Sequence, residues 1–413
     1  MSLDMTSFDA ALKEHYTDER IFNMVYADNP FFAMVAKDEN AGGRNIPVPI
    51  IYGNPQGRSA SFTRAQTRGQ LLASGIEQFT LTRVNDYAVA TIEGETLEAS
   101  KGDSNAFMDA AITEIDGALN SLTRSCAIAQ YGTGYGGIGQ IGSISTTTIT
   151  LLNIQDITNF EVGQELDLAA SESSGTLRAK GSSTNGLIVT GVNRVTGVLT
   201  FGYNVTDATN GIPTAAANDY IFVRGDRQDT ASPARIKLSG LGAWCPSSAP
   251  SSTSFFGVDR TIDSRLAGLR YTGTGYPIEE VLLDAAALAG REGGKPDKVF
   301  MSYQKWADLE KALGSKVQYV EYKMGEVGFK GIRINGPKGP IDAVPDQNAP
   351  ANNAFMLQMN TWKLYSIGKV PKVINADGMQ MLRQASADGV EIRFAYRAQL
   401  GCRAPGFNVN ITL

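Results

Sequence analysis

The sequence has few of the residues on which enzyme and metal chemistry most often depends. Its 413 residues include one histidine, His15, and three cysteines, Cys126, Cys245 and Cys402, which lie far apart and form no C-x-x-C pair. The sequence therefore has too few histidines for a histidine-based zinc site and offers only His15 for a Ser–His–Asp triad. It also has no Walker lysine motif and no G-x-S-x-G or H-E-x-x-H motif. The odd number of cysteines favours buried free thiols over a disulfide. We predict that the protein is not an enzyme and uses no cofactor or metal.

Charged residues and long apolar runs are also scarce. Charged residues make up 19% of the chain and the net charge is −5, which argues against general binding to nucleic acids or membranes, because these partners select a basic excess. No apolar run approaches the roughly 18 residues of a membrane span, and the N-terminal residues show no secretion signal. We expect a soluble protein that is made in a cytoplasm and does not bind a membrane.

The N-terminal part changes character near residue 44. Residues 7–37 are predicted to form short helices, the last of which, NPFFAMVAK, has Asn29 as its cap and Pro30 in its first turn. Residues 44–83 are predicted to form a long two-stranded excursion. Apolar residues alternate along it, as in RNIPVPII, and two strands cannot bury their own faces. We therefore expect this excursion to lie on a surface outside itself.

The tip of this excursion is basic. It contains Arg58, Arg64 and Arg68 without an acidic residue, and Phe62 is one of only two aromatic residues nearby. The arginines could bind phosphate, but aromatic residues for base stacking are scarce. We therefore favour a salt-bridging contact with an acidic protein surface.

A long helix followed by a glycine run comes next. Apolar residues recur every three or four positions over 104–131 (Phe107, Ala111, Ile115, Ala118, Leu122, Cys126, Ala129). The run QYGTGYGGIGQIGS then matches G-x-G-x-x-G in three registers. A dinucleotide loop must follow a strand and open a helix, whereas this run follows a helix and precedes a Thr-rich strand. We predict a helix end and a hinge at Gly132, Gly134, Gly136 and Gly137, and keep a cofactor loop as the less favoured alternative.

The rest of the chain has two parts. Residues 143–235 are rich in Ser and Thr, with short strands between Gly, Asn and Asp turns, and are predicted to form a small β-barrel or sandwich. Beyond residue 236 the pattern is mixed, with helices predicted in PIEEVLLDAAALAG and in the second half of KVFMSYQKWADLEKALG, followed by strands to the C-terminus.

The order of these pieces resembles the major capsid proteins of tailed bacteriophages, which have the Hong Kong 97 (HK97) fold. The resemblance covers residues 1–142 and 236–413, and its clearest segments are NPFFAMVAK with RNIPVPI, AIAQYGTGYGGIGQIG, and KPDKVFMSYQKWADLEKALG. It implies an α+β fold with an all-β insertion, divided as follows: N-terminal arm 1–43, extended loop 44–83, peripheral domain 84–142 and 371–413 with spine helix 104–131, insertion domain 143–235, and axial domain 236–370.

The resemblance also implies function and partners. The protein would assemble with itself, as hexamers and pentamers, into the icosahedral capsid of a virion that encloses double-stranded DNA and contacts it without sequence specificity. Arg58, Phe62, Arg64 and Arg68 would contact a neighbouring subunit. A separate scaffolding protein, a portal and a decoration protein are further expected partners, and assembly would take place in the host bacterial cytoplasm.

Some relatives join this loop to a neighbour through a lysine–asparagine isopeptide bond, but residues 44–83 contain no lysine, so we predict no such bond from this loop. Two structural alternatives remain open: the shell of a bacterial encapsulin-type compartment, and a phage tail or host-binding protein.

Overall fold

The computed structural model describes residues 29–71, 74–93, 104–182, 186–314, 319–324, 327–375, 381–384 and 388–413. The chain forms two compact units and passes between them several times. The first comprises Met1–Ala33, Val84–Gly240 and Ser366–Ala398, and the second comprises Met34–Arg83, Leu241–Tyr365 and Gln399–Leu413. The helices predicted before Asn29 lie outside the described residues.

The second unit is built on a mixed seven-stranded sheet. The strand order is β11-β21-β16-β12-β15-β14-β13, with β11–β21 and β12–β15 parallel. The bounds are β11 Leu269–Thr272, β12 Lys298–Met301, β13 Tyr319–Met324, β14 Val327–Gly336, β15 Gly339–Pro345, β16 Asn353–Leu357 and β21 Val409–Thr412. Because β21 belongs to this sheet, the C-terminal strand lies apart from the peripheral domain to which the sequence analysis assigned residues 371–413.

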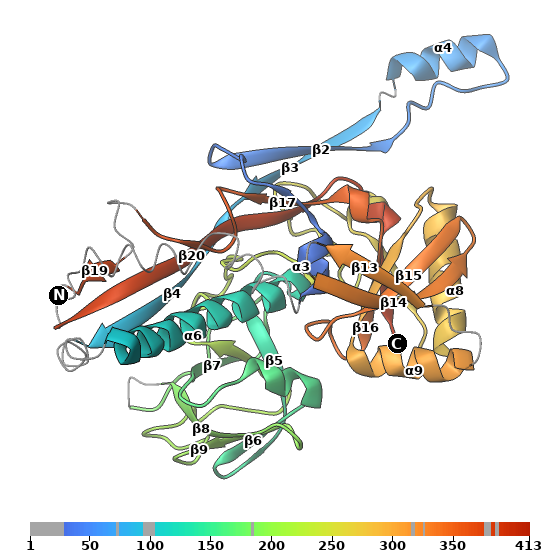
Figure 1. Cartoon of the computed structure of the whole chain (residues 1–413). Coiled ribbons are helices and arrows are strands. Elements are labelled where there is room, and N and C mark those ends of the chain that lie inside the picture. Colours follow the sequence, from blue (N-terminus) through green and yellow to red (C-terminus); the bar gives the residue numbers. More distant parts are fainter. Residues whose placement is uncertain are drawn as a thin grey trace. The chain divides into compact units, whose positions relative to one another are not determined.

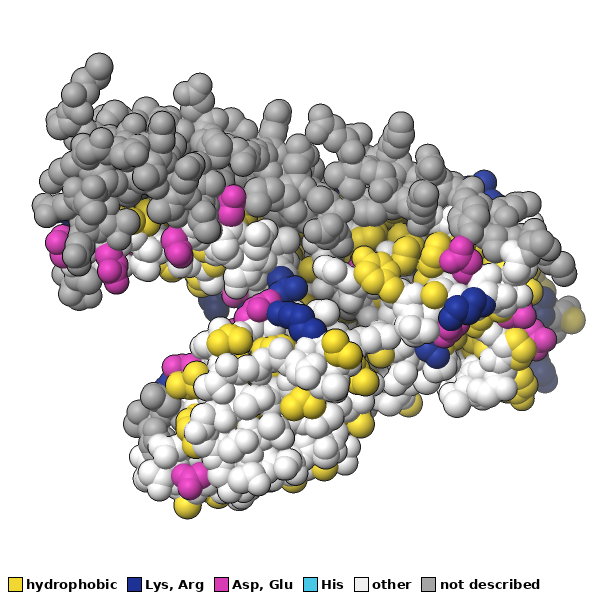
Figure 2. All heavy atoms as spheres, turned by 60° about the horizontal axis from the view of Figure 1, so that its bottom comes forward, with side chains coloured by type: hydrophobic (Ala, Val, Ile, Leu, Met, Phe, Trp, Pro, Cys, Tyr) yellow, Lys and Arg dark blue, Asp and Glu magenta, His cyan; other side chains and the backbone are white. Residues whose placement is uncertain are grey.

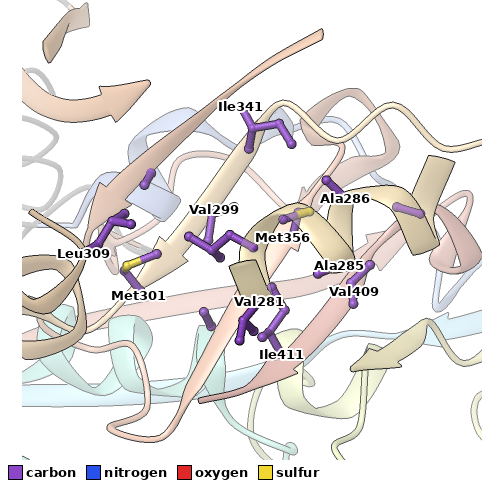
Figure 3. Close-up of a cluster of buried hydrophobic side chains, with 14 of the residues drawn as sticks. Val281, Ala285, Ala286, Val299, Met301, Leu309, Ile341, Met356, Val409 and Ile411 are labelled. Atoms are coloured by element: carbon purple, nitrogen blue, oxygen red, sulfur yellow. The ribbon is translucent and has the colours of Figure 1, made fainter. Parts of the chain in front are cut away.

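Two predicted helices pack on this sheet. Helix α8, Ile278–Arg291, follows Pro277 and has acidic residues in its first turn and a basic one in its last, as the helix dipole favours. Helix α9, Tyr303–Leu313, begins after Ser302, whose hydroxyl accepts from the Lys305 N–H, and ends at Gly314 with a φ of 52°. Side chains from both helices and the sheet form one buried apolar core, part of which is drawn in Figure 3.

The extended loop also belongs to the second unit. Strands β2, Asn45–Gly53, and β3, Gly75–Thr82, pair antiparallel, as predicted, and carry helix α4, Phe62–Leu71, at their tip (Figure 1). Alternate residues of β2 are buried, as the sequence pattern indicated. Helix α4 was not predicted, because its only large apolar residues, Phe62 and Leu71, lie at its two ends and no buried face marks it in the sequence.

Short elements flank the loop. Helix α3, Pro30–Met34, confirms the helix predicted at Asn29–Pro30, and its Phe31 ring lies 5.8 Å from that of Tyr131. The helix is shorter than predicted, because strand β1, Ala36–Asp38, follows and pairs parallel with β17, Trp362–Ser366.

The first unit contains the predicted long helix. Helix α6 spans Ser104–Tyr131 and packs against β4, Val84–Glu93, which pairs antiparallel with β20, Gly389–Cys402. Strands β18, Lys372–Val373, and β19, Met381–Arg383, also pair with β20. Of the predicted apolar face, Ile115, Leu122 and Cys126 are buried, Ala118 and Ala129 are half-buried, and Phe107 and Ala111 lie outside the described side chains.

A closed β-barrel completes the first unit. Its strand order is β10-β5-β6-β9-β8-β7, so of the two predicted architectures, barrel and sandwich, the barrel is the one formed. The bounds are β5 Gly137–Ser145, β6 Thr148–Leu151, β7 Glu165–Ala169, β8 Leu187–Asn193, β9 Val198–Phe201 and β10 Tyr220–Val223. The barrel has its own apolar core, and its first strand begins at Gly137, inside the glycine run and before Ser143.

Candidate assembly surfaces and the barrel junction

Most residues at the tip of the extended loop are exposed. Phe62 and Leu71, at the two ends of α4, have 82% and 75% of their surface accessible. Arg58, Arg64 and Arg68 are exposed as well, and no ion pair is formed by them within the described part of the chain. All four residues that the sequence analysis named at the tip are therefore exposed in the structure.

This tip differs in charge from the rest of the protein. Residues 53–76 contain the three arginines and no acidic residue, which gives a net charge of +3. Since the whole chain has a net charge of −5, the remaining residues have a net charge of −8. A basic tip on an otherwise acidic chain favours contact with another copy of the same chain.

The base of the loop is fixed by an aromatic group that the sequence analysis missed. The ring of Phe79, on β3, lies 5.0 Å from that of Trp244 and 6.1 Å from that of Phe255, and Trp244 lies 6.4 Å from Trp362. The Thr80 N–H donates to the Phe256 carbonyl at 2.8 Å. These contacts position the loop, and no local sequence signal announces them, because the residues are more than 100 positions apart.

A buried arginine supports this aromatic group from the same unit. The guanidinium of Arg260 lies 4.0 Å from the centre of the Phe255 ring, and its Nη1 donates to the Ala243 carbonyl at 2.7 Å. The cation is attracted to the face of the ring, and its N–H group is hydrogen-bonded to a carbonyl. Arg260 therefore helps to hold Phe255 in place.

The glycine run lies where α6 ends and the barrel begins. The Gly132 N–H donates to the Ile128 carbonyl at 3.2 Å and closes the helix. Gly134 and Gly136 have φ values of 91° and 86°, in the region that favours glycine, whereas Gly137 is already part of β5. The run therefore follows the carbonyl end of a helix and leads into a strand. This arrangement does not provide the helix N-terminus that a dinucleotide phosphate requires.

The chain returns from the barrel beside the same glycines. The Lys237 N–H donates to the Gly134 carbonyl at 3.1 Å, and the Gly240 N–H donates to the Gly132 carbonyl at 3.2 Å. The approach is so close that a Cβ at Gly240 would lie 2.1 Å from the Gln130 carbonyl oxygen. We call residues 132–136 and 235–240 the two legs of the barrel.

Buried charges gather at these legs. Lys237 Nζ lies 2.8 Å from Asp86 Oδ2 and 2.8 Å from Asp226 Oδ2, and Ser125 Oγ donates to Asp86 Oδ2 at 2.6 Å. Only 9% of the Lys237 side chain is accessible. Burial raises the pKa of Asp226, while for Lys237 burial acts to lower the pKa but the two carboxylates raise it above its usual value.

A second group fixes the first leg to the barrel. Burial raises the pKa of the Glu172 carboxyl, which accepts a hydrogen bond from the Gly137 N–H and lies beside the Thr133 side chain. The guanidinium of Arg235, on the second leg, lies 4.7 Å from the centre of the Tyr135 ring. Side chains from the barrel and from both legs therefore pack on one another.

Metal-ligating groups and thiols are also found elsewhere in the described part of the chain. Within the described residues, no three metal-ligating side chains come together, and no helix there is long and apolar enough to cross a membrane. Cys126, Cys245 and Cys402 are buried free thiols, as predicted, and burial raises the pKa of Cys402 to about 12. The face of the barrel seen in Figure 2 carries few charged side chains.

Comparison with known proteins gives one family. The sequence model of the SU10 major capsid protein family matches residues 200–377, which confirms the resemblance stated from the sequence and the α+β fold that it implied. No curated protein sequence matches the chain.

Solved structures similar to this chain include the capsid of cyanophage A-1(L), with a TM-score of 0.46 and 12% identity over 93% of this chain and 92% of that one. The structure of Mycobacterium phage Ogopogo has a TM-score of 0.43 and 7% identity, over 94% of this chain and 92% of that one. The SrpI encapsulin of Synechococcus elongatus PCC 7942 has a TM-score of 0.42 and 6% identity, over 100% of this chain and 96% of that one.

Proposed function

We propose that this chain, a major capsid protein of a tailed phage, is held in its icosahedral shell by the extended loop 44–83, whose tip docks on a neighbouring copy. Arg58, Phe62, Arg64 and Arg68 make this contact. One observation supports the proposal above the others: none of the side chains of α4 is buried in its own subunit.

An isolated helix of this length needs a partner. Helices shorter than about 12 residues are marginal in water, and α4 has 10. Docking on a second copy would bury Phe62 and Leu71 and bring the arginines to a surface of opposite net charge. Each such contact is modest, but a closed shell repeats it at every subunit, and the repetition makes the assembly stable.

Further partners follow from the same role. The chain forms hexamers and pentamers, and the junction glycines Gly132, Gly134, Gly136 and Gly137 allow the barrel to adjust between these two environments. The net negative charge keeps contact with packaged double-stranded DNA weak and without sequence specificity. A scaffolding protein, a portal and a decoration protein complete the particle, which assembles in the host cytoplasm.

The loop contact is tested by reversing its charge. We expect the double variant Arg64→Glu/Arg68→Glu to lower the yield of closed particles at least about tenfold, because like charges then face each other at every copy of the contact. The matched control is Arg64→Lys/Arg68→Lys, which keeps the charge and is expected to assemble. Particles are counted by negative-stain microscopy and sedimentation, and the melting temperature of the unassembled subunit is expected to stay unchanged.

Normal particle yield from the charge-reversed variant would contradict the proposal. The composition of the purified wild-type particles decides between the two kinds of shell: packaged DNA supports the phage capsid, and an enclosed enzyme without DNA supports a compartment.

A further inference from the structure

The junction between α6 and the barrel combines two opposite properties. Its glycines allow backbone conformations that other residues rarely adopt, with φ of 91° at Gly134 and 86° at Gly136. Yet a buried ionic group lies directly on the legs, and it joins three elements: Asp86 from β4, Ser125 from α6, and Asp226 with Lys237 from the chain that leaves the barrel. We call these four residues the junction cluster.

We propose that this junction is a locked hinge: the glycine run allows the barrel to swing, and the junction cluster holds the barrel in one position against α6 and β4. Lys237 is the central positioning residue, because its ammonium group is the only member of the cluster that contacts all three others. Opening the cluster frees both legs without breaking either the barrel or the long helix.

The separate cores on the two sides of the junction support this inference. The barrel is closed and buries its own apolar side chains, and α6 buries Ile115, Leu119 and Leu122 in the first unit outside the barrel. The junction cluster belongs to neither core. Its loss therefore releases the connection and leaves the two connected parts folded.

The charges of the cluster show why the lock can open. Two half-buried carboxylates face one buried ammonium group, so full ionisation leaves one uncompensated negative charge in the cluster. The hydroxyl of Tyr396, on β20, is also buried near Asp86 and Asp226, and it brings no positive charge. Burial accordingly raises the pKa of Asp226. A cluster with this imbalance is held less firmly than a neutral buried pair.

A second contact between α6 and the barrel does not replace the cluster. Arg124 of α6 and Arg194 of the barrel both bind Glu161, at 2.7 and 2.9 Å. All three side chains are largely exposed, and exposed ion pairs contribute little to stability. Of these two ionic contacts, the junction cluster is therefore the stronger restraint on the legs.

Hydrogen–deuterium exchange on the full-length subunit tests the lock. We expect Lys237→Met to speed exchange in both legs at least about tenfold, because it leaves two half-buried carboxylates beside each other without their cation. Exchange in the barrel strands and in α6 is expected to stay within about twofold of wild type. The matched control is Lys180→Met, which removes the 2.6 Å ion pair to Asp167 inside the barrel and is expected to leave the legs unchanged.

A milder variant covers the case in which Lys237→Met does not fold. Ser125→Ala removes one hydrogen bond to Asp86, and a rise of several-fold in leg exchange alone is expected. Wild-type exchange of the legs in both variants would overturn the proposal. So would a joint rise in the legs, the barrel strands and α6, or the same rise in the Lys180→Met control. None of these readouts depends on shell assembly, so they are independent of the proposed loop contact.

Discussion

The close approach at the junction predicts that two glycines with the same backbone conformation tolerate a side chain very differently. Gly136 has a φ of 86° and Gly163, in the barrel, a φ of 89°. A Cβ at Gly163 would meet nothing within 4 Å, whereas a Cβ at Gly136 would lie 2.5 Å from the Asp226 carbonyl oxygen. The comparison therefore separates backbone strain, which both positions share, from steric overlap, which only Gly136 has.

The expected magnitudes follow from these two terms. Placing alanine at a positive φ costs about 1–2 kcal/mol at either position. At Gly136 the overlap is with backbone, which cannot rotate away, and such overpacking adds about 1–3 kcal/mol. We therefore expect Gly163→Ala to lower the free energy of barrel opening by about 1–2 kcal/mol, and Gly136→Ala to lower it by about 2–5 kcal/mol.

The assay must report on the barrel itself. The three tryptophans, Trp244, Trp306 and Trp362, all lie in the second unit, so their fluorescence does not follow the barrel. Native-state hydrogen exchange of the barrel strands at increasing urea gives the opening free energy directly. Equal losses for the two variants, within about 0.5 kcal/mol, would refute the reasoning that the junction glycines are needed for space as well as for conformation.

Two further predictions concern the base of the loop and the barrel core. Phe79→Ala is expected to destabilise the second unit by about 3–5 kcal/mol, because the ring is fully buried among aromatic side chains. Urea unfolding followed by tryptophan fluorescence measures this loss. The control is Ile76→Ala, on the exposed side of the same strand, which is expected to cost less than about 1 kcal/mol. Burial raises the pKa of Asp156 to about 6, so this group favours the folded state at low pH and the benefit is lost as the pH rises through 6. Asp156→Asn is therefore expected to stabilise the barrel by about 1–2 kcal/mol at pH 8 and not at pH 4, and an equal effect at both pH values in hydrogen exchange would contradict this.

The extended loop shows how far sequence patterns reach. The alternation of Ile46, Val48 and Ile50 predicted β2, because a strand places every second side chain on the same face. Helix α4 was missed, since it has only two large apolar residues, Phe62 and Leu71, and none of its side chains is buried. The residues that we propose to contact a neighbour were named from the sequence, because an excess of arginine without acidic residues does not depend on the conformation.

The junction shows the opposite case. The glycine run was recognised from its neighbours in the sequence, since a helix precedes it and strand-forming residues follow. The Lys237 cluster gave no such signal, because Asp86 and Lys237 are 151 positions apart and pair only when β4, α6 and the returning leg come together.

The sequence by itself determined the local elements and the broad class of the protein. The bounds of α6, the starts and ends of α8 and α9, and the absence of catalytic and metal-binding motifs all depend on residues close together in the chain. Only the tertiary structure decided that the island of strands closes into a barrel, that Phe79 and Trp244 fix the base of the loop, and that buried charges hold the junction. The physical reason is the same in each case: these features are contacts between distant segments, and their energies depend on burial and geometry that no local pattern specifies.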